Sequence, residues 1–131
     1  MDSYFVVAHS DVAKEYCRET RRVAGKLLEG LSESLDLKPD AIAKATGFGN
    51  GFQVFVANLY PPCPQPELAR GLPAHIDLGF LDFIIQNGVC GLQISHKGKW
   101  VNVNPVPNSI LVNTAAQLEV NSTHSLPRKK F

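Results

Sequence analysis

The segment 71–77, with the sequence GLPAHID, carries the side chains best suited to chemistry in this chain. His75 and Asp77 are two residues apart, so in an extended chain their side chains project to the same side. An imidazole and a carboxylate that converge in this way supply two of the three ligands of a 2-His-1-carboxylate facial triad, which holds non-haem Fe(II) and leaves its other positions open. The pair alone is a weak signal, because a hydrogen-bonded His–Asp pair is the alternative interpretation.

The residues that precede this segment predict helices. Residues 10–37 form an amphipathic pattern, which is typical of one long helix. Its apolar side chains recur at steps of four or seven, at Val12, Tyr16, Val23, Leu27, Leu31 and Leu35. We expect this stripe to face the core, and a groove for a partner helix is the alternative. A second, short helix is predicted over residues 39–46, with Gly47 at its end.

After Gly47 the pattern changes to short strands. Residues 52–60 are rich in β-branched and aromatic side chains and predict a strand. The prolines that follow exclude regular structure as far as residue 72, so we expect a rigid loop, with a polyproline ligand as the alternative. Further strands are predicted over 80–86, 91–95, 100–103, 109–114 and 117–120, the second and third forming a hairpin. They indicate part of an antiparallel jelly roll, whose closed form has about eight strands.

Composition and charge exclude several classes of function. The 131 residues include 13 Lys and Arg against 12 Asp and Glu, and a net charge of +1 gives no broad attraction to nucleic acid. No apolar run approaches the roughly 18 residues of a membrane span, and no secretory leader is predicted. The three cysteines form no C-x-x-C motif, so we expect reduced thiols and a cytoplasmic location. Cys63 is expected to be a small packed residue, with a reactive thiol as the alternative.

Four motifs together resemble one family. They are NLYPPCPQPEL at 58–68, GLPAHID at 71–77, GLQ at 91–93 and GKWV at 98–101. Their order and spacing are similar to those of the plant-type Fe(II)/2-oxoglutarate-dependent dioxygenases, the isopenicillin N synthase-like group, and most similar to the branch that acts on flavonoids and other specialised metabolites. The resemblance implies an α+β fold. Amphipathic helices over 1–46 would precede a partial double-stranded β-helix, or jelly-roll barrel, over 47–131.

The resemblance also implies a site and a reaction. His75 and Asp77 match the first two iron ligands, and Asn58 and Tyr60 match positions at the 2-oxoglutarate site; no catalytic side chain is expected beyond the ligands. Members of the family use Fe(II) and 2-oxoglutarate, form succinate, and hydroxylate or desaturate a small molecule. We therefore expect a small, flavonoid-like substrate, no nucleic-acid or membrane partner, and association with full-length relatives.

The sequence departs from the family pattern in several places. Counted onward from Asp77, the third iron ligand of the family falls on Phe131, and the Arg-x-Ser clamp for 2-oxoglutarate falls beyond it. His124 is the alternative third ligand, although it comes too early and its surroundings do not match. Ala116 and Asp82 stand where relatives usually have Asp and Thr. We therefore expect a truncated member with weak or no turnover; an interaction module, or a product without function, is the alternative.

Overall fold

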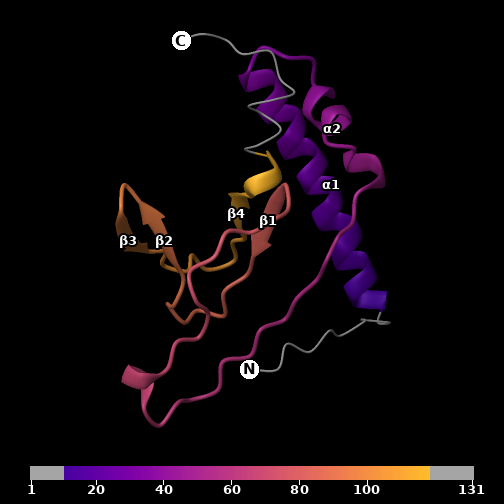
Figure 1. Cartoon of the computed structure of the whole chain (residues 1–131). Coiled ribbons are helices and arrows are strands. Elements are labelled where there is room, and N and C mark those ends of the chain that lie inside the picture. Colours follow the sequence, from indigo (N-terminus) through magenta and orange to yellow (C-terminus); the bar gives the residue numbers. More distant parts are fainter. Residues whose placement is uncertain (1–10, 119–131) are drawn as a thin grey trace. The chain divides into compact units, whose positions relative to one another are not determined.

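The computed structural model describes residues 11–118, which contain helices in their first part and antiparallel strands in their last (Figure 1). The elements are α1 (Asp11–Ser34), α2 (Ala41–Ala45), the 3-10 turns η1 (Phe48–Asn50) and η2 (Pro66–Leu68), and the strands β1 (Leu81–Ile84), β2 (Gln93–His96), β3 (Lys99–Asn102) and β4 (Leu111–Thr114). The chain divides into two compact units between Ile76 and Asp77. Among the described residues, no helix has both the length and the apolar character of a membrane span.

The long helix is confirmed, but the predicted core face is wrong. The buried side chains of α1 repeat every four residues, at Thr20, Ala24, Leu28 and Ser32. The predicted stripe is largely exposed: Val12 is 79% exposed and Leu35 42%. Three of these four side chains are small, which lets other segments approach the helix backbone closely. The backbone N–H of Ile42, in α2, donates to the Ser32 hydroxyl at 3.2 Å, so α2 packs on this face.

Arg21 holds the turn that follows α2. Gly47 ends the second helical segment in the left-handed conformation, with φ of 64°, as its position predicted. The Arg21 guanidinium then donates to three carbonyl groups of this turn, those of Phe48 at 2.6 Å, Gly49 at 3.2 Å and Gly51 at 3.1 Å. It also lies over the Phe48 ring, 5.0 Å from its centroid. One side chain therefore fixes the whole of η1 against α1.

From η1 the chain runs back along α1. The Gln53 amide donates to the Cys17 carbonyl at 3.0 Å and to the Thr20 hydroxyl at 2.9 Å. Two residues later the Phe55 ring meets the Tyr16 ring edge to face, with centroids 5.7 Å apart. The order of these contacts, toward ever lower residue numbers of α1, shows that the segment is antiparallel to the helix.

The predicted strand over 52–60 is wrong. These nine residues are irregular and exposed, and the Phe52 side chain is fully exposed. High β-propensity becomes a strand only where a neighbouring strand accepts its backbone hydrogen bonds, and none of the described strands pairs with this segment. Its side-chain contacts to α1 fix its path instead.

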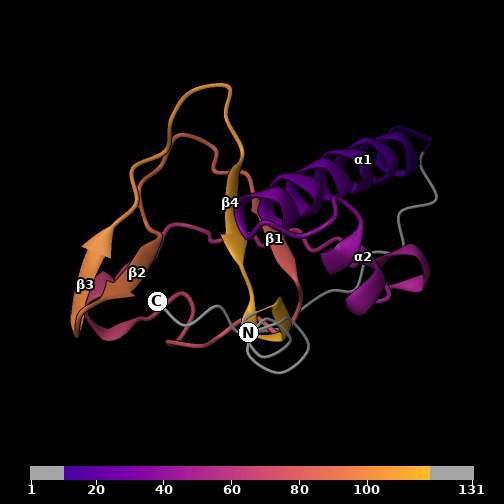
Figure 2. The same cartoon turned by 90° about the horizontal axis from the view of Figure 1, so that it is seen from above.

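The strands of the second unit form two antiparallel pairs, β1 with β4 and β2 with β3 (Figure 2). The β2–β3 hairpin is confirmed: His96 faces Lys99, and Lys97 and Gly98 between them both have positive φ, 49° and 75°. Two left-handed residues form the turn type whose twist suits a hairpin. β1 and β4 lie inside their predicted ranges. The last predicted strand is wrong at its start, because residues 116–118 are helical; residues 119 and 120 lie outside the described part.

The Arg21 contacts generate a stability prediction. Arg21→Ala removes three hydrogen bonds from a charged donor, and we expect it to lower the free energy of unfolding by about 2 kcal/mol. Arg21→Lys should recover only a fraction of this loss, because an ammonium cannot reproduce the guanidinium fork. Urea denaturation followed by circular dichroism measures both.

The matched control for Arg21 is Arg22→Ala on the same helix. Arg22 is exposed and contacts Glu19 in an ion pair, so its removal should have a much smaller effect. An equal decrease in the free energy of unfolding for Arg21→Ala and Arg22→Ala would contradict the stabilising role of the Arg21 hydrogen bonds.

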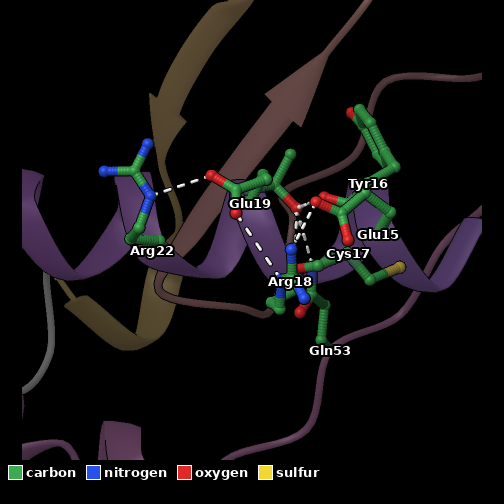
Figure 3. Close-up of polar contacts among 8 residues, drawn as sticks. Glu15, Tyr16, Cys17, Arg18, Glu19, Arg22 and Gln53 are labelled. Carbon is green, nitrogen blue, oxygen red and sulfur yellow. Dashed lines mark hydrogen bonds and ion pairs between the residues drawn. The ribbon is translucent and has the colours of Figure 1, made fainter.

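The exposed charges of α1 generate a second prediction. Glu19 accepts a hydrogen bond from Arg22 Nε at 2.8 Å and lies 3.6 Å from Arg18 Nε (Figure 3). The Arg22 hydrogen bond and charge lower the pKa of Glu19, with a smaller contribution from Arg18. A lowered pKa in the folded state means that the stabilisation is complete above the ordinary pKa and is lost as the pH falls through the lowered one.

We therefore expect Glu19→Gln to lower the melting temperature slightly at neutral pH and to have no effect at low pH. Thermal unfolding of both proteins across the acid range measures this difference. Glu29→Gln, at an exposed position of the same helix, controls for the loss of one negative charge. A difference that grows as the pH falls would contradict the prediction.

Candidate metal and cosubstrate site

Asn58 and Tyr60, the predicted 2-oxoglutarate residues, lie on exposed, irregular chain in the first unit. The proline-rich loop after them contains one 3-10 turn, η2, closed by a hydrogen bond of 3.1 Å from Leu68 N to the Gln65 carbonyl. The loop returns to Tyr60 at Gly71: a Cβ atom placed on Gly71 would lie only 3.1 Å from Tyr60 Cε1. The Tyr60 ring therefore lies directly against the backbone that leads to His75.

His75 lies on exposed, irregular chain near the end of the first unit. Its Nδ1 atom lies 2.9 Å from the Pro73 carbonyl oxygen. Because a carbonyl oxygen only accepts hydrogen bonds, Nδ1 carries the proton in this contact, and the lone pair of the neutral ring is then on Nε2. A metal-binding histidine commonly has this arrangement, in which the second nitrogen donates to a carbonyl or a carboxylate.

Asp77 begins the second unit and is half-buried. Its carbonyl accepts a hydrogen bond of 2.9 Å from Ala116 N. Two more bonds of 3.1 Å follow, from Gln117 N to the Gly79 carbonyl and from Ala115 N to the Phe80 carbonyl. The segment 77–80 is thus fixed against the turn that follows β4.

Asp82 is a half-buried acidic residue of the second unit to which the sequence analysis gave no role. It lies on β1 opposite Asn113, and its Oδ2 atom is buried without a hydrogen-bond partner among the described residues. Burial raises the pKa of the Asp82 carboxyl, and the nearby charge of Asp77 raises it further. The sequence showed Asp82 only as a departure from the family pattern.

A complete facial triad is not found in the described part of the chain. Across residues 11–118, no three His, Cys, Asp or Glu side chains gather closely enough to hold a metal ion. His124 and Phe131 lie outside the described residues. The expectation that Cys63 is packed is wrong, because its side chain is exposed on the proline-rich loop.

The comparisons with known proteins agree on one family. Residues 51–129 match the family model described as the 2OG-Fe(II) oxygenase superfamily. The chain is 41% identical over 114 residues to Protein DMR6-LIKE OXYGENASE 2 of Arabidopsis thaliana, which covers 87% of this chain and 32% of that protein. It is 40% identical over 114 residues to the leucoanthocyanidin dioxygenase of Malus domestica, covering 84% of this chain and 31% of that protein. The chain therefore spans about a third of the length of these curated relatives.

A solved structure is also similar. The crystal structure of JOX2 in complex with 2OG, Fe and JA matches with a TM-score of 0.72 and 32% sequence identity, covering 84% of this chain and 33% of that one. This similarity is consistent with a jelly-roll fold. The described residues contain a long helix and a few antiparallel strands, which are part of such a structure. All four predicted site residues and Asp82 fall inside the range that the family model matches.

Proposed function

Because the chain belongs to the 2OG-Fe(II) oxygenase superfamily, whose cofactors are Fe(II) and 2-oxoglutarate, we propose that it carries part of a site that oxidises a small molecule. The observation that carries this proposal is the family match over residues 51–129, which encloses the H-x-D motif. In the proposed reaction, 2-oxoglutarate loses CO₂ to give succinate, which takes up one atom of O₂. The other oxygen atom goes into a hydroxylated product or, in a desaturation, leaves as water.

The residues present are of the right chemical kind for this metal. An imidazole and carboxylate oxygens are ligands that suit non-haem Fe(II). We assign Nε2 of His75 and the carboxylate of Asp77 to the metal, and the Nδ1 contact to Pro73 supports the required form of the His75 ring. The buried Asp82 oxygen without a partner also fits a cation nearby. When bound, the metal supplies the oxidising chemistry, and these residues hold it in place.

Asn58 and Tyr60 are assigned to 2-oxoglutarate. The Asn58 amide and the Tyr60 hydroxyl are hydrogen-bond donors, and a dicarboxylate offers only acceptors. The Tyr60 contact with Gly71 supports this assignment, because it links the Tyr60 ring to the segment that leads to His75.

The finer parts of the proposal extend beyond the described residues. We assign the two strand pairs to a partial double-stranded β-helix over 47–131, preceded by a helical segment over 1–46. We infer the substrate class from the relatives, because one is named for leucoanthocyanidin and JOX2 was solved in complex with JA. A small, flavonoid-like metabolite is the proposed substrate. Weak turnover and a cytoplasmic location stay predictions.

The first test is anaerobic Fe(II) binding to the full chain, by calorimetry, with and without 2-oxoglutarate. We expect 2-oxoglutarate to strengthen binding. We expect His75→Ala to weaken it at least about tenfold, since even the loss of a residue behind a ligand has effects of this size. Succinate formation that requires both Fe(II) and Asp77 would show in addition that the chain carries out the proposed reaction.

The matched control for His75 is His96→Ala. His96 is also exposed, at the end of β2, and should leave Fe(II) affinity unchanged. Equal Fe(II) affinity for the unchanged chain, His75→Ala and His96→Ala would overturn the proposed site.

The contact between Gly71 and Tyr60 generates a separate prediction. A methyl group on residue 71 would displace the Tyr60 ring by a few tenths of an ångström. We therefore expect Gly71→Ala to weaken 2-oxoglutarate binding several-fold and to leave metal affinity unchanged. Calorimetry with the metal-loaded chain measures both affinities.

Gly91→Ala is the control for Gly71→Ala, because nothing lies within 4 Å of a Cβ atom at Gly91. It should change neither affinity. If Gly71→Ala also leaves 2-oxoglutarate affinity unchanged, Tyr60 does not contact the cosubstrate.

A second candidate function is an interaction module without turnover. The observation that favours it is the exposed apolar stripe of α1, with Val12, Val23, Leu27 and Leu35 accessible in the structure. Concentration-dependent association with a full-length relative, unchanged by His75→Ala and without succinate formation, would favour this function over the first.

A further inference from the structure

The chain contains two Asn–Gly steps, Asn50–Gly51 and Asn87–Gly88. Asparagine is among the thermolabile residues of proteins, because the backbone nitrogen of the next residue can attack its side-chain amide. A following glycine favours this attack, since it has no side chain to shield the nitrogen and allows the backbone many conformations. The two steps have the same local chemistry but lie in different surroundings, so the structure decides which of them reacts.

The Asn87–Gly88 step is accessible. It lies in the irregular loop between β1 and β2, where both residues are exposed. The Gly88 N–H makes no hydrogen bond among the described residues, and nothing lies within 4 Å of a Cβ atom placed on Gly88. Its φ of 88° is a conformation that glycine adopts without strain. The attacking nitrogen at this step is therefore neither covered nor engaged.

The Asn87 side chain is folded toward this nitrogen. Its Oδ1 atom accepts a long hydrogen bond, of 3.4 Å, from the Val89 backbone N–H. A bond of this kind turns the asparagine side chain over the peptide group that joins residues 87 and 88. The nitrogen of that peptide group is the attacking atom, so the bond keeps Cγ of Asn87 near it. The same bond also stabilises the negative charge that develops on Oδ1 during the attack.

The Asn50–Gly51 step, by contrast, is held by the turn that Arg21 fixes. Asn50 is the last residue of η1. The Gly51 N–H donates to the Phe48 carbonyl at 3.3 Å, and the Gly51 carbonyl accepts from Arg21 at 3.1 Å. Attack by the Gly51 nitrogen requires this turn to open, which breaks hydrogen bonds that stabilise the fold. The second step is therefore protected where the first is not.

We propose that Asn87 is a site of spontaneous modification, at which the folded chain converts asparagine to isoaspartate and aspartate. The Gly88 nitrogen forms a bond to Cγ of Asn87, the bond from Cγ to Nδ2 breaks, and ammonia leaves with the proton of the attacking nitrogen. Water then opens the cyclic imide. Opening at the main-chain carbonyl carbon gives isoaspartate, and opening at Cγ gives aspartate. No oxidant or cofactor takes part, and the inference does not depend on the proposed function.

The modification changes the charge and the backbone of this loop. No Asp or Glu occurs from residue 83 to residue 118, so either product brings a negative charge into a stretch that has none. In isoaspartate the chain continues through the former side-chain carbonyl, which lengthens the backbone between β1 and β2. The free α-carboxylate that remains is the group that isoaspartyl methyltransferases methylate. An enzyme of this class is the partner that the modified loop fits.

Incubation of the full chain, followed by tryptic digestion and mass spectrometry, tests the proposal. Trypsin releases residues 71–97, in which Asn87 is the only asparagine, so its conversion is read directly. We expect conversion at Asn87 to be about tenfold or more faster than at Asn50, where hydrogen bonds have to break first. The rate at Asn87 should rise with pH, because the attacking nitrogen must lose its proton.

Asn87→Gln is the variant that tests the modified residue itself. The longer side chain forms its cyclic imide far more slowly, so most of the isoaspartate detected by enzymatic methylation of the aged chain should disappear. Isoaspartate that is as abundant in Asn87→Gln as in the unchanged chain would overturn the proposal. Equal rates of conversion at Asn87 and Asn50 in the folded chain would do so as well.

Arg21→Ala supplies the matched control, because it removes contacts from the protected turn and leaves the Asn87 loop unchanged. It should speed conversion at Asn50 and leave the rate at Asn87 unaltered. In concentrated urea, where neither loop is held, the two steps of the unchanged chain should convert at similar rates. A tenfold difference that persisted in urea would assign the contrast to neighbouring residues and contradict the structural argument. This comparison decides if Arg21→Ala fails to fold.

Discussion

The Arg21 guanidinium fixes the point at which the chain leaves η1 and turns back along α1. Its three carbonyl acceptors all belong to the turn 48–51, and no other described side chain makes a comparable set of bonds to backbone. Once this turn is fixed, Gln53 and Phe55 can reach Cys17, Thr20 and Tyr16. The path of the segment that leads to Asn58 and Tyr60 is therefore set by contacts to α1, a helix that supplies none of the proposed site residues.

The sequence was informative wherever local rules decide the structure. The long helix, the left-handed Gly47 and the β2–β3 hairpin all follow from periodicity or turn chemistry within a few residues. It failed where the outcome depends on distant partners. Residues 52–60 have the composition of a strand but meet side chains of α1 instead of a neighbouring strand. The buried face of α1 was missed because small polar residues, Thr20 and Ser32, satisfy their own hydroxyl groups on helix carbonyls and can then be covered.

In the candidate site, too, the local features could be predicted from the sequence and those that depend on distant residues could not. The H-x-D motif is a local pattern, and sequence alone was enough to single out His75 and Asp77. The structural setting of Asp82, by contrast, is visible only in the structure. Its Oδ2 atom is buried without a partner among the described residues, and backbone hydrogen bonds hold the nearby segment 77–80 in place. Those bonds join residues that are far apart in the chain, and no spacing rule anticipates them. The family match covers both parts of the sequence, and it is the reason for proposing a metal at the H-x-D motif.

The hydrogen bond between His75 and the Pro73 carbonyl has a consequence for the freedom of the imidazole ring. It joins two residues of the same short stretch, at 2.9 Å, and needs no contact with β-structure. The tautomer and the orientation of the ring are thus set by a neighbour in the sequence. A ring that is already held in this way loses little further freedom when it binds a ligand, so less of the binding free energy is spent on ordering it.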